Sequence, residues 1–443
     1  MTALIIALTL LCAALMFLVP KEYKLAILFM GTMLLSFVVM PVKGIKAMMV
    51  ITVAFLISEL PDIRIHLRRI RFSVMLPYLI LVLFSFVLAV VTSPNLHNLN
   101  DFGYFTLSEV IVKQFALIYG FLILRRKRSL KPLLMVSFAA LVLMTLIGYF
   151  NLLTGSSFYI EQLAGDIQLD YDFTHKQRFR VQATFVNPFD YGYMCVLLAL
   201  LHLYGYLQRM EMLSMLAVSQ ACCLFGVVSC NCRTILFCYL VCALIFAVAL
   251  QKSRWMKLQI LLGAIAAGVL IVMTVPAIRK VFFMMLTIFD ATSMVNGSSL
   301  AMRLLQFTTV LYYISGSYVW FGRGVHFFEQ DLGWENGSAL ASDYDLFGLE
   351  GIYLNLLLER GVVGFAIYLA MMVLILVFII RHRKLGRLLY SLGLSVFLLY
   401  FLFSFMTGEL LSATPTFYIL GYVIANQTLR KRFLEWRRKK CRA

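Results

Sequence analysis

The sequence predicts an all-helical, polytopic integral membrane protein. Of the 443 residues, 62% are hydrophobic and only 14% carry a formal charge, and the mean hydropathy is +0.90. Apolar stretches that are long enough to cross the hydrocarbon core as helices recur from one end of the chain to the other. Composition and pattern together predict a single transmembrane domain, residues 1–443, with about 12–13 transmembrane helices.

Each predicted span is an apolar run close to the roughly 20 residues that a helix needs to cross a ~30 Å hydrocarbon core. The chain offers about thirteen such runs, separated by short polar or basic segments. The predicted spans are residues 2–19, 25–41, 45–60, 73–93, 106–124, 132–152, 188–207, 213–231, 234–251, 258–276, 352–380, 388–406 and 414–428.

The basic residues indicate how these spans are oriented. Lys and Arg gather in blocks on alternate loops, and these loops hold 27 of the 39 basic residues and four of the 21 acidic ones. Such an asymmetry marks the cytoplasmic side of a membrane protein. The net charge of +18 therefore reflects topology, and no nucleic-acid partner is expected. The blocks are 21–24, 64–71, 125–131, 209, 252–257, 381–387 and 430–442.

This orientation places two long loops on the outer side, at residues 153–187 and 277–351. In the second loop, residues 281–290 and 300–314 carry apolar residues at helical spacing, which predicts helices on the membrane surface or against the bundle. Polar groups at a membrane are unfavourable unless they are used or paired. We therefore expect a functional site to involve these loops and the adjoining helix ends.

Several kinds of chemistry have no support in the sequence. The six histidines are scattered, and neither HExxH nor a His/Cys ligand spacing is present, so no metal or other cofactor is expected. Walker, GxSxG and dinucleotide-binding glycine patterns are also absent. Cys230 and Cys232 lie near the outer face, but a separation of two residues suits a disulfide poorly, so we interpret them as packing residues.

The first group of polar candidates lies just before the span 188–207, in the stretch RFRVQATFVNP that begins at Arg178. An arginine stays charged near a membrane, and its planar fork of donors suits a diphosphate, so Arg178 and Arg180 are candidate substrate ligands. The structural alternative is that both pair with the aspartates of 166–172 and anchor the loop. Asn187 is a further candidate contact, although it also fits the turn that enters the helix.

Two further groups contain single arginines. Arg233 interrupts two apolar spans joined by almost no loop, so it faces a polar cavity or snorkels to the interface. Arg303 falls at the start of the helical stretch 300–314, where the helix dipole disfavours a cation and an anionic partner is required. That partner is a phosphate or an acidic residue such as Glu350. Arg323 lies between two glycines that we interpret as a turn.

The last group brings carboxylates together where the long loop returns to the membrane. Asp345 and Glu350 precede the next span, and Tyr353 lies in its first turn. Glu350 fits a helix cap there, and it also fits a base that accepts a proton from a sugar hydroxyl. Deeper in the span, Glu359 and Arg360 are expected to neutralise each other.

Taken in order, these groups resemble the bacterial O-antigen polymerase and ligase superfamily. That family shows an Arg-x-x-Gly-Thr-Phe-x-Asn-Pro-Asn-like stretch before a span, then a Ser-Arg-Gly-like turn and an Arg opening a helix in a large periplasmic loop. A Gly-x-Gly follows near the end of that loop. The next helix then starts with a His-Asn-x-Tyr-Leu-like stretch and closes with Glu-x-Gly. The corresponding residues here are Arg180, Thr184, Phe185, Asn187, Pro188, Arg233, Arg303, Gly322, Gly324, Tyr353, Leu354, Glu359 and Gly361.

The resemblance covers roughly residues 180–375, and within it the chain departs from the family at several positions. The ligases carry His-Asn where this chain has Glu350 and Gly351, and that His takes part in the mechanism proposed for the ligases. Its absence favours the Wzy-like polysaccharide polymerase branch. The other departures are Ala183 for Gly, Phe189 for the second Asn, and Cys232 and Thr234 beside the arginine.

The resemblance implies a GT-C-like glycosyltransferase in the bacterial inner (cytoplasmic) membrane, with its active site and both long loops facing the periplasm. The implied substrate is an undecaprenyl-diphosphate-linked oligosaccharide repeat unit, and the implied reaction is metal-independent polymerisation. Arg180, Arg233 and Glu350 would be catalytic; Arg178, Asn187, Arg303, Arg323, Asp345 and Tyr353 would bind substrate. Membrane lipid, a chain-length regulator and the repeat-unit flippase are implied partners.

Two rival functions follow from the same sequence. An O-antigen ligase would transfer glycan from the carrier lipid to lipid A-core instead of elongating it. A lipid-linked oligosaccharide transporter or flippase would perform no chemistry, but such folds often show internal repeats and polar residues at the bilayer midplane. This chain shows no convincing repeat, and its polar groups are predicted at the outer face.

Overall fold

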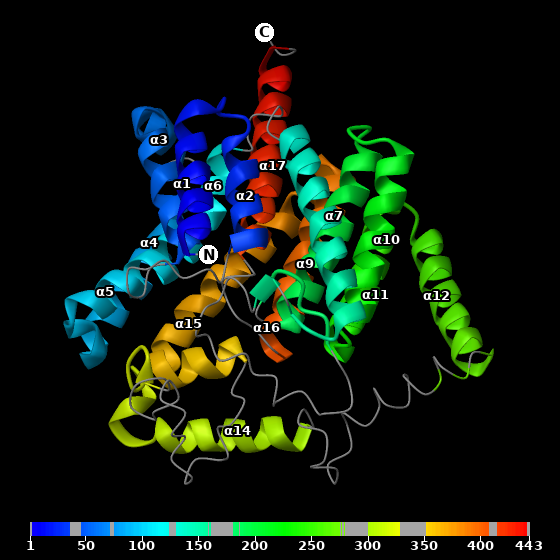
Figure 1. The fold of residues 1–443 in the computed structure, drawn as a ribbon. Helices are drawn as coiled ribbons and strands as arrows, with labels where there is room; N and C mark the ends of the chain where they lie inside the picture. The colour runs from blue at the N-terminus through cyan, green and yellow to red at the C-terminus, as the bar shows by residue number, and fades with distance from the viewer. Residues whose placement is uncertain are drawn as a thin grey trace.

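The computed structural model is a bundle of helices, as the sequence predicts (Figure 1). It describes residues 2–35, 46–70, 75–123, 130–157, 159–160, 180–185, 187–274, 276, 279, 300–327, 351–406 and 414–440. The regular elements of these residues are all helices. Most of the two long loops, including the predicted helix at 281–290, lies outside the described residues.

The first half of the chain supplies one side of the bundle, where α1, α2 and α3 pack on one another and α2 also packs on α7. η2 is a π-helix, and α6 follows it after a bend of 42°. The elements are α1 Thr2–Leu18, α2 Lys24–Leu35, α3 Ala47–Ile70, α4 Met75–Thr92, η1 Pro94–His97, α5 Leu99–Phe105, η2 Thr106–Gln114, α6 Ala116–Ile123 and α7 Leu130–Thr154.

The second half supplies the other side and the centre of the bundle. α9, α10 and α11 pack together, α16 lies against α11 and α9, and α17 lies against α6. α14 runs across the lower end of the bundle in Figure 1, below α15. The elements are α9 Pro188–Leu207, α10 Leu213–Ser229, α11 Arg233–Leu250, α12 Arg254–Thr274, α14 Leu300–Tyr313, η6 Gly316–Val319, α15 Ile352–Arg381, η10 Arg383–Leu385, α16 Arg387–Met406 and α17 Thr414–Lys440.

Each of the thirteen predicted spans coincides with a helix of this bundle, or with a bent pair in the case of 106–124. By length and apolar content, five described helices can cross a membrane, and a sixth span results if the bent pair counts as one. These five are α4, α7, α11, α15 and α16. The chain is therefore a polytopic membrane protein, and the count of thirteen spans stays a prediction.

α6 and α17 approach each other unusually closely. A Cβ atom added to Gly120 would lie 2.2 Å from the carbonyl oxygen of Tyr418, and one added to Gly421 would lie 2.3 Å from that of Leu117. Small residues allow membrane helices to pack backbone against backbone, which compensates for the weak hydrophobic drive between helices in lipid. This contact fixes η2, which leads into α6, against the centre of the bundle.

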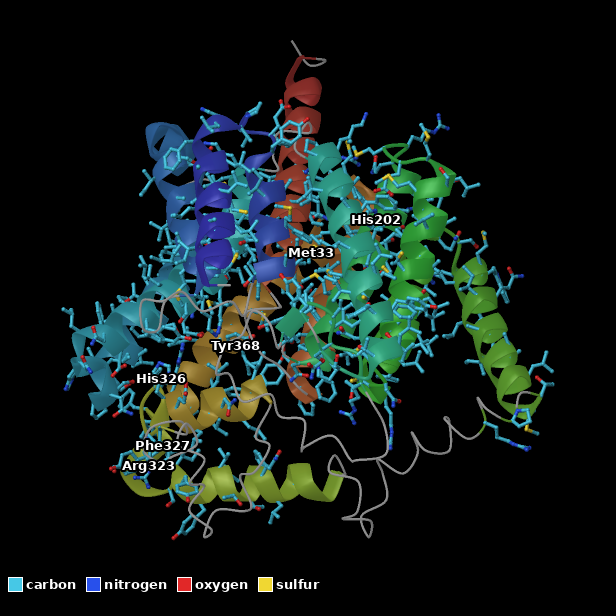
Figure 2. All side chains as sticks on the ribbon, in the orientation of Figure 1. Met33, His202, Arg323, His326, Phe327 and Tyr368 are labelled. Carbon is cyan, nitrogen blue, oxygen red and sulfur yellow. The ribbon has the colours of Figure 1, made fainter. Side chains whose placement is uncertain are left out.

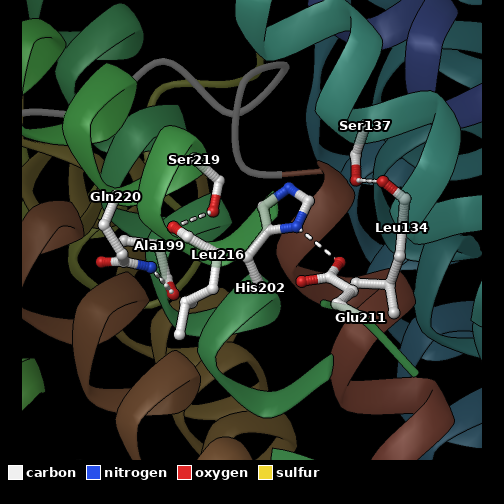
Figure 3. A network of polar contacts seen from close by, with 8 residues as sticks. All are labelled: Leu134, Ser137, Ala199, His202, Glu211, Leu216, Ser219 and Gln220. Atoms are coloured by element: carbon white, nitrogen blue, oxygen red, sulfur yellow. Dashed lines mark hydrogen bonds and ion pairs between the residues drawn. The ribbon is translucent and has the colours of Figure 1, made fainter. Parts of the chain in front are cut away.

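At the upper end of the bundle, a buried polar pair holds the turn between α9 and α10 (Figure 3). His202 Nδ1 lies 2.7 Å from Glu211 Oε1, and the two side chains are 0% and 1% exposed. Nearby, Gln220 Nε2 donates to the carbonyl oxygen of Ala199 at 2.9 Å and joins α10 to α9. Burying such groups is favourable only when they find partners, so this network specifies how α9 and α10 pack.

Candidate functional site

Arg180 lies at the lower end of the bundle, beside the turn between α10 and α11. The backbone N–H of Val181 donates to the carbonyl oxygen of Ser229 at 3.1 Å, which joins the Arg180 segment to the end of α10. On its other side, the Thr184 hydroxyl donates to the carbonyl oxygen of Met33, at 2.8 Å, in α2. The segment 180–185 is therefore fixed between α2 and the α10–α11 turn.

The α10–α11 turn carries Arg233, which is half-buried and is the first residue of α11. The hydrogen bond from the Val181 N–H to Ser229, at the end of α10, holds the residue after Arg180 against this turn. Two arginines 53 positions apart in the sequence lie on adjoining segments.

The aromatic ring of Phe189 supports the Arg180 side chain. The guanidinium carbon lies 5.7 Å from the ring centroid, within the range of a cation–π contact. Phe189 stands in the first turn of α9, and the Asn187 side chain caps this helix by accepting a hydrogen bond from the Phe189 N–H at 2.9 Å. The turn-forming interpretation of Asn187 is confirmed, and its contact with substrate stays a prediction.

Ala183, the residue that stands where the family has glycine, adopts a backbone φ of +50°. Only glycine adopts this left-handed region without a steric penalty, so the structure explains why glycine suits the position. The methyl group of Ala183 is fully buried in the packed segment. The surrounding contacts therefore maintain the turn despite the departure.

A second group of site residues lies at the other side of the lower end, where Arg323 is labelled near α14 and α15 in Figure 2. The guanidinium carbon of Arg323 lies 3.7 Å from the centroid of Tyr318 and 5.7 Å from that of Phe327, and its Nε donates to the carbonyl oxygen of Tyr313 at 2.6 Å. Arg323 is held by aromatic rings at the end of α14, away from the α10–α11 turn in Figure 2.

The turn around Arg323 packs directly on a kink in α15. Gly322 has φ +73° and Gly361 has φ +60°, and a Cβ atom added to either would lie 2.4–2.5 Å from backbone atoms of the other segment. The N–H of Arg323 donates to the carbonyl oxygen of Leu358, and the N–H of Val363 donates to that of Trp320, at 2.9 and 3.1 Å. The interpretation of the Gly-x-Gly as a backbone turn is confirmed, and we call the paired segments 320–324 and 358–363 the glycine clamp.

The expected neutralisation of Glu359 by Arg360 is wrong. Glu359 Oε1 accepts a hydrogen bond from the backbone N–H of His326 at 3.1 Å, whereas Arg360 Nη1 donates to the Ser85 hydroxyl at 3.1 Å. Adjacent residues of a helix point in different directions, so the two side chains reach different neighbours. Arg360 is only 5% exposed and lies over the Phe105 ring at 5.5 Å.

Glu109 and Lys113, which sequence reasoning passed over, lie beside Arg360. Both belong to the π-helix η2 and form an ion pair with each other. Glu109 also interacts electrostatically with Arg360 and His326. A usable signal was present, because two charged residues inside the predicted span 106–124 are unfavourable in lipid and indicate a polar site.

Tyr353 packs in an aromatic group between α15 and α16. Its ring centroid lies 6.1 Å from Tyr368 and 5.9 Å from both Phe401 and Phe405. The Tyr368 hydroxyl is hydrogen-bonded to that of Tyr400, which in turn interacts electrostatically with Glu109. The structure therefore connects Tyr353 to the Glu109 group through two further tyrosines.

Four predicted site residues are not tested in this way. Arg178, Asp345 and Glu350 lie outside the described residues, and for Arg303 the structure describes the backbone only. Arg303 falls in the first turn of α14, Leu300–Tyr313, which confirms the predicted helix start at residue 300. Among the residues that the structure describes, no group of three or more His, Cys, Asp or Glu side chains could hold a metal ion.

Comparison with known families addresses the region from Val218 in α10 to Leu369 in α15. Residues 218–369 match the O-antigen ligase family. This match agrees with the O-antigen polymerase and ligase superfamily that the sequence motifs resemble, and it includes Arg233, Arg303, Arg323 and Tyr353. Arg180 precedes the matched O-antigen ligase-family region, to which the next residue, Val181, is joined by its hydrogen bond to Ser229. No curated protein matches the chain.

At the level of this family, the match supports a function of the O-antigen ligase and polymerase type, carried out by a glycosyltransferase-like membrane enzyme. The ligase and polymerase reactions share a lipid-linked glycan donor and differ in the acceptor. The choice between them rests on the residues of this chain.

Proposed function

We propose that this protein is a polysaccharide polymerase that elongates undecaprenyl-diphosphate-linked oligosaccharide repeat units at the periplasmic face of the bacterial inner membrane. The hydroxyl at the non-reducing end of one lipid-linked unit attacks the anomeric carbon of the growing chain. A new glycosidic C–O bond forms, the bond between the anomeric carbon and the diphosphate breaks, and the hydroxyl proton is released. Undecaprenyl diphosphate is the leaving group.

The observation that carries this proposal is the position of the Arg180 segment beside the α10–α11 turn, which leads into Arg233 at the start of α11. As the diphosphate departs, negative charge develops on its oxygens. Fixed guanidinium groups stabilise this charge without rearranging during the reaction and without a metal ion. Phe189 and the fixed 180–185 segment hold Arg180 in advance, which is the preorganisation that such catalysis requires.

The remaining predicted residues complete the proposal. Arg303, on the same long loop as Arg323, would contribute a further guanidinium group to the diphosphate, and Glu350 would accept the proton of the attacking hydroxyl, with Asp345 as the alternative base. Arg178, Asn187, Arg323 and Tyr353 would bind other parts of the substrate. A chain-length regulator and the repeat-unit flippase are proposed partners.

The polymerase is favoured over the ligase by Glu350 and Gly351, which stand where the ligases of the superfamily carry His-Asn. A ligase reaction needs lipid A-core as acceptor, whereas a polymerase needs only the lipid-linked repeat unit. A flippase moves the same lipid without changing the glycan. The three functions therefore give different products from one defined substrate.

The test reconstitutes the purified chain in lipid vesicles with lipid-linked repeat units extracted from cells that lack it. A polymerase produces a ladder of longer glycans on the carrier and releases one undecaprenyl diphosphate for each new linkage. Arg180→Ala and Arg233→Ala are expected to slow this release at least tenfold, because each removes charge-assisted hydrogen bonds worth about 1.5–3 kcal/mol. Arg209→Ala, an exposed arginine between α9 and α10 at the opposite end, is the matched control.

Each contrary result has a specific meaning. Glycan transfer that occurs only when lipid A-core is added identifies a ligase. Movement of the lipid across the vesicle membrane without any change in glycan length identifies a flippase. A normal ladder from both arginine variants removes Arg180 and Arg233 from the chemistry.

A further inference from the structure

Three irregular backbone segments meet at the lower end of the bundle, on the side of α4 and α5. The first is the π-helix η2, and the second is the kink of α15 at Gly361. The third is His326, whose φ of +62° lies in the left-handed region that non-glycine residues rarely adopt. Irregular helices and strained residues often occur at functional sites, since each is unfavourable unless its surroundings maintain it.

Charged side chains from these segments face one another. η2 contributes the Glu109–Lys113 ion pair, the kink of α15 contributes Arg360, and His326 lies within electrostatic reach of Glu109. Aromatic rings surround the group: Phe105 lies under Arg360, and Tyr104 lies 6.2 Å from the His326 ring. We call Glu109, Lys113 and Arg360 the η2 cluster.

The η2 cluster retains unused hydrogen-bonding capacity beside partly exposed charged groups. Arg360 is 95% buried, but its Nε has no hydrogen-bond partner among the described residues. A guanidinium carries five donors, and within the part of the chain that the structure describes, one of them is used, in the bond to Ser85. Glu109 and Lys113 are 18% and 12% exposed, so the ion pair keeps some contact with the surroundings whereas Arg360 is almost fully buried. A buried donor without an acceptor is unfavourable, and a ligand oxygen atom bound to Arg360 Nε would remove this penalty.

The chemistry of the η2 cluster selects the kind of ligand. The Glu109–Lys113 ion pair is neutral overall, so the η2 cluster offers a carboxylate acceptor beside cationic donors. A sugar matches both, because its hydroxyl groups donate to a carboxylate and accept from Lys and Arg. Aromatic rings such as Tyr104 and Phe105 suit the apolar C–H faces of a pyranose. We propose that the η2 cluster binds a sugar of the lipid-linked repeat unit, with Glu109 accepting a hydroxyl hydrogen bond and Arg360 and Lys113 donating to sugar oxygens.

This inference rests on the proposed function for the identity of the glycan, and it adds a subsite outside the arginines that face the diphosphate. The glycine clamp, together with Val325, positions the η2 cluster. The N–H of Val325 donates to the Ser93 hydroxyl at 2.8 Å, and Glu359, next to Arg360, holds the backbone of His326. The loop between α14 and α15 is therefore tied to the end of α4 around this cluster.

The experiment measures binding of two lipids to the full chain in nanodiscs. One is the pool of undecaprenyl-diphosphate-linked oligosaccharides extracted from cells that lack the chain, and the other is undecaprenyl diphosphate without sugar. Glu109→Gln is expected to raise the Kd for the sugar-bearing lipid at least tenfold and to change the Kd for the bare carrier less than twofold. Lys113→Gln gives the same pattern and carries the test if Glu109→Gln does not accumulate.

The matched control is Glu59→Gln. Glu59 and Lys24 form a second buried ion pair, 3.0 Å long and 9% and 6% exposed, between α3 and α2. Glu59→Gln tests whether removing any buried carboxylate weakens lipid binding. We expect the Kd for the sugar-bearing lipid and the Kd for the bare carrier to stay unchanged in this variant. The site is refuted if Glu109→Gln and Lys113→Gln bind the sugar-bearing lipid as the wild type does, or weaken both lipids equally. It is also refuted if the wild type binds both lipids with the same Kd.

The sugar site and the polymerase proposal fail in different ways. If the wild-type chain prefers the sugar-bearing lipid through Glu109 but never lengthens the glycan, the sugar-site proposal stands and the polymerase proposal is refuted. If the Glu109→Gln variant elongates the glycan normally, the polymerase proposal stands and the sugar-site proposal is refuted.

Discussion

Replacing Gly322 by alanine is expected to break the glycine clamp. Gly322 combines two features that exclude a side chain: its φ is +73°, and an added Cβ atom would lie 2.4 Å from the carbonyl carbon of Glu359 and 2.5 Å from the nitrogen of Arg360. Both of these contacts are backbone atoms, which cannot rotate away as a flexible side chain can. The segments 320–324 and 358–363 must therefore separate.

The size of the effect follows from these two features. A left-handed conformation costs about 1–2 kcal/mol for a residue with a Cβ atom. Forcing an extra carbon into a packed contact costs about 1–3 kcal/mol more. The sum is about 2–5 kcal/mol. Because the clamp positions Arg360 and Glu359, we also expect slower glycan elongation at unchanged protein abundance wherever the variant still folds.

Gly316 offers a matched control on the same loop. Its φ is +74°, but nothing lies within 4 Å of an added Cβ atom. Gly316→Ala therefore carries only the conformational penalty of about 1–2 kcal/mol. The assay is thermal unfolding of both purified variants in the same detergent, followed by glycan elongation in vesicles. Equal apparent unfolding temperatures for the two variants would show that the clamp contact adds nothing and would refute this reasoning.

Further predictions concern the pair at the upper end, the Arg180 site and the absence of a metal. Glu211→Ala removes the partner of buried His202 and is expected to cost about 1.5–3 kcal/mol, seen as a lower apparent unfolding temperature; an unchanged temperature contradicts the role given to this pair. Phe189→Leu removes the cation–π contact with Arg180, worth about 0.5–2 kcal/mol, and should raise the Kd for undecaprenyl diphosphate about two- to thirtyfold. If the Kd of the Phe189→Leu variant is unchanged, Phe189 does not support Arg180 in binding the diphosphate. Chelation by EDTA should leave the rate of glycan elongation by the purified chain unchanged, because guanidinium groups stabilise the leaving diphosphate. A loss of elongation that added divalent cation restores would contradict this prediction.

Much of the architecture follows from the sequence because hydropathy and helix boundaries are local properties. Apolar runs of membrane-spanning length predicted the positions of the helices. Pro188 after a capping Asn187 marks the start of α9, and Gly351 precedes α15 at residue 352, as expected. The order of the arginine motifs likewise indicated the family that the match at residues 218–369 supports.

The details around η2 were beyond such reasoning. A window average over residues 106–124 remains apolar despite Glu109 and Lys113, so hydropathy hides the ion pair. The π-helix and the bend of 42° lead into α6, whose close packing on α17 joins residues about 300 positions apart, a contact that local sequence does not reveal. The separation of Glu359 from Arg360 depends on His326, which reaches α15 only through the glycine clamp.

The central claim is that arginines from distant parts of the sequence bind one carrier-lipid diphosphate. The affinity of the chain for undecaprenyl diphosphate tests this claim most directly. The account predicts that Arg180→Ala and Arg233→Ala each raise the Kd at least tenfold, while Arg209→Ala leaves it within twofold of the wild type. If the Arg180 and Arg233 variants bind undecaprenyl diphosphate as tightly as Arg209→Ala does, the account is contradicted.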